Sequence, residues 1–135
     1  MACACLAGLW LRFDFLDESH RISQDIETPT GSFWHAIMHR REGDFGNSKY
    51  WYAKVGHHPI LPAIGQHVAS AIGQLPADKS LLKLLIGGWS PEAFVDLVED
   101  VSLNPQDPRL ASVVAIQRIE WRMLFEHCTR AASGG

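Results

Sequence analysis

Apolar residues recur along this chain at steps of three and four, and stretches with that spacing are separated by Gly, Pro, Asn and Asp. Such spacing places side chains on one face of a helix, whereas a half-buried strand needs strict alternation. No stretch alternates over the length of a strand. The pattern therefore predicts an all-α protein, a single compact bundle or array of five to six helices joined by short turns.

Capping residues and turn residues set the expected limits of these helices. The expected helices run from about 5 to 26, from Thr30 or Ser32 to near Gly43, from Asp44 to Val55, from about 61 to 75, from Ser90 onward and from about 109 to 131, with a short apolar segment at 80–86. Ser90-Pro91-Glu92 is typical of a helix start, and Gly43 and Gly56 are typical of helix ends. We expect one domain over 1–131 and a frayed tail at 132–135.

Composition and charge narrow the choice of partners. A chain of 135 residues fits one domain, and its formal net charge is −3. The densest basic stretch, 39–41, is followed at once by Glu42 and Asp44, so a phosphate-neutralising surface for nucleic acid is not expected. Arg12 and Asp14 interrupt the apolar N-terminus too early for a membrane span. With only three cysteines, an odd number, we expect a soluble, cytoplasmic protein.

Histidines and a glutamate fall on faces that the pattern predicts to be buried. His20 continues the apolar stripe of the first expected helix. His35, His39 and Glu42 share one face of the second at spacings of four and three, which brings side chains together on a helix. We therefore expect His20, His35, His39 and Glu42 to approach one another.

Glu120 lies at the edge of the apolar face of the last expected helix. An unpartnered carboxylate costs several kcal/mol to bury, so Glu120 needs a partner. A histidine or an arginine of the second expected helix is the natural candidate for that partner.

Three hypotheses about function follow, and the sequence leaves all three open. The first is a pocket for a small anionic or sugar-like ligand, in which arginine holds the anion and aromatic rings stack on the ligand. Its residues would be His20, His35, His39, Arg40, Arg41, Glu42, Tyr50 and Glu120. Acid–base catalysis by the same histidines is open, so the chain is not assigned as an enzyme.

The second hypothesis is a divalent transition-metal site made by His35, His39 and Glu42, with His20 or Glu120 as a fourth ligand. An open position on such a metal would allow hydrolytic chemistry. In the third hypothesis, the polar groups form only an internal network that fixes helix register, and the protein is a scaffold or assembly module, for instance a homodimer.

Two segments together carry a resemblance to a known family. The first holds Asp17-Glu18-Ser19-His20, the segment WHAIMHRREGDF at 34–45, and Lys49-Tyr50-Trp51; the second holds Phe94-Val95-Asp96-Leu97 and the residues from Gln117 to Cys128. They resemble a family of small, helical, uncharacterised proteins of bacteria and fungi. The resemblance covers most of the chain, implies one compact helical unit and carries over no catalytic role.

Overall fold

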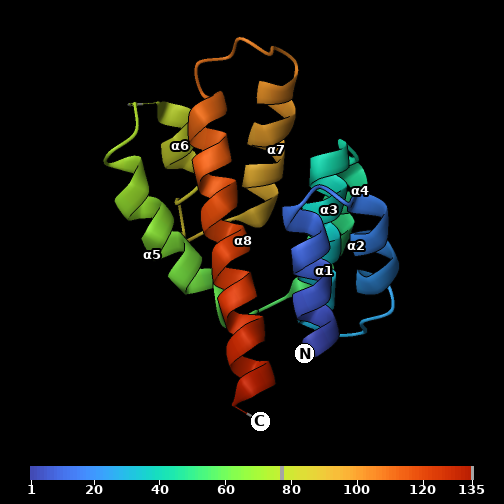
Figure 1. Cartoon of the computed structure of the whole chain (residues 1–135). Coiled ribbons are helices and arrows are strands. Elements are labelled where there is room, and N and C mark those ends of the chain that lie inside the picture. The colour runs from blue at the N-terminus through green and yellow to red at the C-terminus, as the bar shows by residue number, and fades with distance from the viewer. Residues whose placement is uncertain (77, 135) are drawn as a thin grey trace.

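The computed structural model describes residues 1–76 and 78–134, and every regular element among them is a helix (Figure 1). The all-α prediction is confirmed, but the described residues form eight helices rather than five to six. They are α1 (Ala2–Arg12), α2 (Leu16–Ser23), α3 (Pro29–Glu42), α4 (Phe45–Val55), α5 (Leu61–Ile72), α6 (Lys79–Lys83), α7 (Pro91–Ser102) and α8 (Leu110–Ser133). Residue 77, in the segment Pro76-Ala77-Asp78 whose composition predicts a turn, and residue 135, in the predicted tail at 132–135, lie outside the described part.

The single helix expected over 5–26 is wrong, because α1 and α2 are separate helices. Asp14 between them has a φ of 67°, in the left-handed region that Asp enters more readily than most residues. Because of this residue, the buried face of α2 does not continue the buried face of α1. Leu9 and Phe13, which have the apolar spacing of a single long helix with a buried stripe, are 40% and 67% exposed. Helix α1 instead buries the small face of Ala4, Ala7 and Gly8 together with Leu11.

Most other limits follow the capping residues. Asp44 caps α4 and Ser90 caps α7, as expected. The start of α3 lies slightly earlier than expected, because the Thr28 hydroxyl accepts a hydrogen bond of 3.1 Å from the Gly31 amide and Pro29 takes the first helical position. Gly43, with a φ of 85°, ends α3 in the left-handed conformation that glycine adopts freely.

Helix α3 is the central element of the fold. Every residue from Thr30 to Arg40 is buried, and the helix packs against α1, α2 and α4. In Figure 1, α8 runs along the length of the molecule, with α5 and α6 on one side of it and α1–α4 on the other. Because α3 is buried from Thr30 to Arg40, the polar side chains of that stretch lie in the interior, where each needs a partner.

The fold confirms that Glu120 of α8 has an arginine partner on α3. Its Oε1 lies 2.6 Å from Nη2 of Arg40, and both side chains are fully buried. The Tyr52 hydroxyl donates to the second Glu120 oxygen at 2.7 Å and accepts from Arg40 at 2.7 Å. The Arg40 guanidinium also lies 4.6 Å from the centre of the Phe94 ring. This group of side chains joins α3, α4, α7 and α8.

Candidate metal centre

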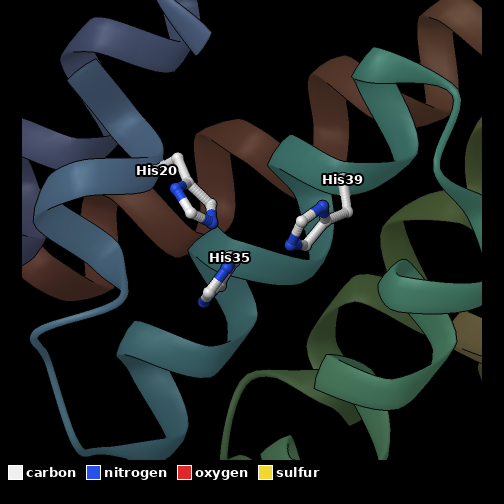
Figure 2. A group of neighbouring side chains, drawn as sticks. All are labelled: His20, His35 and His39. Carbon is white, nitrogen blue, oxygen red and sulfur yellow. The ribbon is translucent and has the colours of Figure 1, made fainter. Parts of the chain in front are cut away.

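Three histidines from two helices meet at one point beside α3. His20 comes from α2, and His35 and His39 come from successive turns of α3. Each offers a ring nitrogen, and these three atoms all lie within 4.8 Å of one another. The ring centroids are 4.6 Å apart for His20 and His35, 5.4 Å for His20 and His39, and 4.7 Å for His35 and His39. Figure 2 shows a nitrogen of each ring facing the space between them.

The convergence has a local cause in each helix. The spacing of four residues brings His35 and His39 to the same face of α3. Helix α2 turns back along α1 after Asp14, and the buried Ser19 hydroxyl fixes it there by donating to the Ala7 carbonyl at 3.0 Å. The next residue of α2, His20, then faces α3. The sequence predicts that His20, His35, His39 and Glu42 approach one another. The three histidines do, whereas Glu42 groups with His39 and Asp44 instead.

His35 is the member of the cluster whose ring nitrogens lack hydrogen-bond partners. Its side chain is buried and stacks on the Trp51 ring at 3.9 Å. Neither Nδ1 nor Nε2 of His35 has a hydrogen-bond partner among the described residues. An unpartnered buried polar atom costs about 1–3 kcal/mol, so folded proteins rarely leave one without a purpose.

The electrostatics keep His35 uncharged. Burial is the main cause that lowers its pKa to about 3, and nearby His39, His20 and Lys54 lower it further in the same direction. The ring is therefore neutral at pH 7. Neutral imidazole has a free lone pair and is the form that binds metal ions.

His39 is oriented by a carboxylate. Its Nδ1 lies 2.7 Å from Oε1 of Glu42 and 3.8 Å from Oδ2 of Asp44. Because an ionised carboxylate only accepts hydrogen bonds, Nδ1 of His39 is the donor, and in the neutral form of the ring Nε2 carries the lone pair. Hydrogen bonds from the side chain and then the backbone of Asn47 lower the pKa of Asp44, which keeps that neighbour ionised. A carboxylate behind a histidine is the usual outer shell of a histidine-bound metal.

Four of the predicted ligand-binding residues lie away from the histidine cluster. Arg40 and Glu120 are held in the buried group described above. Burial alone would lower the pKa of Arg40, but the facing Glu120 carboxylate raises it above the usual value. Arg41 donates to the Leu11 carbonyl and pairs with Asp14 at 2.8 Å.

Tyr50, the fourth of these residues, is 54% exposed on α4, and the Lys54 ammonium lies 4.9 Å from its ring centre. The neighbouring residue Trp51, not Tyr50, stacks on His35. The periodicity of the stretch 44–55 placed Trp51 on the core side, but no signal in the sequence paired it with His35.

A second histidine pair lies apart from the cluster. The sequence from Gly56 to Pro59 has the composition of a polar turn, yet His58 within it is 4% exposed, and its ring centre is 4.9 Å from that of His127 on α8. Nδ1 of His58 accepts from the Ile60 amide at 3.4 Å, so Nε2 carries the proton and donates to the Thr30 hydroxyl at 3.0 Å. His58 therefore links the segment after α4 to the start of α3.

The burial of His58 beside His127 predicts how the free energy of unfolding depends on pH. Burial, and then His127, lowers the pKa of His58 to about 4, whereas a histidine of the unfolded chain titrates near pH ~6.5. The neutral ring thus stabilises the fold above pH ~6.5, and that contribution is lost as the pH falls toward 4. We expect His58 to account for a loss of up to about 3 kcal/mol over this range, in addition to the loss caused by buried His35 in the metal-free protein. Urea unfolding with a chelator present measures both, and a His58 variant separates them.

The matched variants are His58→Gln and, as a control, His67→Gln on the exposed face of α5. His58→Gln should be less stable at pH 7 and lose less stability as the pH falls, while His67→Gln should follow the unmodified protein. Equal pH slopes for His58→Gln and the unmodified protein would contradict this assignment.

Within the described residues, no helix combines the length and apolar character needed to cross a membrane. Comparison with known proteins adds no further constraint: no family model, no curated protein and no solved structure matches this chain. The resemblance to small bacterial and fungal helical proteins thus stays a prediction, and the function has to be inferred from the side chains themselves.

Proposed function

We propose that this protein binds a divalent transition-metal ion through His20, His35 and His39. The observation that carries the proposal is the buried His35 ring, whose two nitrogens have no partner among the described residues while two further imidazoles face it. A metal ion would satisfy one of those nitrogens and would hold α2 against α3.

The three histidine nitrogens are close enough to bind one such ion after a small movement of the rings toward one another. Metal–nitrogen bonds of about 2.0–2.1 Å in a tetrahedral site put ligand nitrogens roughly 3.3 Å apart. The three nitrogens here lie within 4.8 Å of one another, so the rings need to close by no more than about 1.5 Å. His20 can supply most of that movement, because it is only partly buried and lies on a short helix.

The donor set indicates which ions fit. Imidazole nitrogen suits zinc, copper, iron and nickel more than magnesium or calcium. Three protein ligands also leave a coordination position for a fourth ligand, which is the composition of catalytic rather than structural zinc sites. Glu42 then takes a role different from the one expected from the sequence: it orients His39 from behind instead of binding the ion. Hydrolysis is the reaction class that such a centre would support.

The two other hypotheses explain less of the arrangement. A pocket for an anionic or sugar-like ligand built from the same residues would require Arg40 and Glu120, yet each is fully buried against the other. A purely internal network accounts well for that ion pair. It gives no partner to either nitrogen of His35, however, whereas a metal ion would satisfy one of the two.

The direct test is metal analysis of protein purified without an affinity tag that binds metal. We expect close to one equivalent of a transition metal, or uptake of one equivalent of Zn²⁺ or Co²⁺ after chelator treatment. Bound Co²⁺ should give the intense visible absorption of a tetrahedral site. Only trace metal, with no saturable uptake of either ion, would contradict the proposal.

Substitutions locate the ion. His35→Gln should abolish stoichiometric Co²⁺ binding, and Glu42→Gln should weaken it by about 10–100-fold, as removal of an outer-shell partner usually does. His67→Gln, an exposed histidine on α5, is the matched control and should bind like the unmodified protein. Circular dichroism establishes that each variant is folded. Full binding by a folded His35→Gln variant would place the ion elsewhere.

A further inference from the structure

A second site lies on the opposite face of α3. A cleft of about 400 Å³ opens between α1, α3 and α8. Ile37 and Arg41 of α3 line it, whereas His35 and His39 form the metal centre. The two pairs are offset by two positions on the helix, and two positions correspond to a rotation of about 200°. The cleft and the histidine cluster therefore share α3 but face away from each other.

Positive charge dominates this cleft. Four arginines line it: Arg12 from α1, Arg41 from α3, and Arg118 and Arg122 from successive turns of α8. They are four of the 12 lysines and arginines in a chain whose net charge is −3. No acidic side chain is among the residues that line the cleft.

Two of these arginines lack an acidic partner. Among the described residues, neither Arg12 nor Arg118 forms an ion pair, and Arg122 approaches Glu126 only to 4.0 Å. Arg41, by contrast, is already paired with Asp14. Burial lowers the pKa of Arg41, and the proximity of Arg40 and Arg12 adds to that effect against the opposing influence of Asp14. The repulsion among these guanidinium groups is what a bound anion would relieve.

We propose that this cleft binds a small organic anion with at least two negative charges, carried by a phosphate group or by several carboxylates. The planar guanidinium matches both groups with paired hydrogen bonds. Gln117 offers a further polar contact, and Trp121 gives an apolar surface for the body of the ligand. The volume falls within the range of about 300–1,000 Å³ of small-molecule sites.

The shape of the site favours a small ligand over a nucleic acid. The arginines converge on one hollow instead of forming a stripe along the surface, and the chain as a whole is acidic. A polyanion needs an extended basic face to neutralise successive phosphates. A single compact anion needs only the convergence seen here.

The test is calorimetric titration of the full chain with citrate and with ribose 5-phosphate, using uncharged ribose as the neutral probe. We expect saturable binding of at least one of the two anions and none of ribose. The Arg118→Ala, Arg122→Ala double variant should bind at least about tenfold more weakly, since a charge-assisted hydrogen bond contributes about that factor or more. Both positions are exposed, so the variant should fold.

Arg130→Ala is the matched control, because Arg130 is an exposed arginine of α8 outside the cleft. It should bind like the unmodified protein, and so should His35→Gln, which separates this site from the metal centre. The proposal is overturned if neither anion binds saturably, or if the double variant binds as well as Arg130→Ala. It is also overturned if an oligonucleotide or an anionic vesicle, rather than a small anion, shows the dependence on Arg118 and Arg122.

Discussion

Replacing Glu120 with alanine is expected to destabilise the protein by about 3–5 kcal/mol, because the charge of Arg40 would remain buried without its counter-charge. The Glu120 and Arg40 side chains are both fully buried, at 2.6 Å from each other. The loss would also leave the Tyr52 hydroxyl without its acceptor. Since small domains are stable by only about 5–15 kcal/mol, this variant should be partly unfolded at 37 °C or show a strongly lowered midpoint in urea.

Two further variants separate the ion pair from the loss of side-chain volume. Glu126→Ala removes an exposed carboxylate from the same helix and should change stability by less than about 0.5 kcal/mol. The triple variant Arg40→Met, Tyr52→Phe, Glu120→Leu removes the whole polar group and should recover much of the stability that Glu120→Ala loses. If Glu120→Ala is no less stable than Glu126→Ala, the buried pair does not have this structural role.

Saturation with Zn²⁺ is expected to raise the Tm of the protein strongly. An ion that binds only the folded state stabilises it by about 4 kcal/mol when its free concentration is a thousand times Kd. For a chain of this length that corresponds to a rise in Tm of roughly 10–15 °C. The physical reason is that the ion would tie His20 of α2 to His35 and His39 of α3. Thermal unfolding followed by circular dichroism measures it.

The His35→Gln variant and an excess of chelator serve as controls for this shift. The chelator should return Tm to that of the metal-free protein. His35→Gln should melt at nearly the same temperature with and without Zn²⁺. A rise in Tm of similar size in that variant would show that Zn²⁺ acts at other groups, and the metal-site assignment would then fail.

Local sequence signals predicted much of the fold. The caps Asp44 and Ser90 and the terminating Gly43 act within a few residues of themselves, so their positions could be predicted from sequence alone. The first helix could not, since its apolar spacing runs unbroken through Asp14. The left-handed conformation of Asp14 is accompanied by its pairing with Arg41, 27 residues later. A contact between residues so far apart cannot be predicted from the local spacing of apolar residues.

In the candidate site, too, local spacing could be predicted from the sequence and contacts between distant residues could not. The spacing of His35 and His39 predicted their proximity, since it depends only on helix geometry. His20 was placed near them by continuing a stripe along one long helix, yet it reaches them because α2 folds back against α3. The cost of burial predicted a partner for Glu120, but not that the partner would be Arg40 rather than a histidine.

No feature of the sequence predicted the arginine cleft. Arg12, Arg118 and Arg122 are individually exposed and resemble ordinary solvated charges. Only the packing of α1 and α8 on either side of α3 brings them together.

Three consecutive residues of α3 serve three different parts of the molecule: His39 faces the histidine cluster, Arg40 the buried pair with Glu120, and Arg41 the arginine cleft. Each position on a helix is rotated by about 100° from the one before. One inserted or deleted residue before this stretch would therefore turn all three side chains away from their partners at once. Among descendants of this sequence, the length of the segment should accordingly be kept more strictly than the identity of any one of its residues.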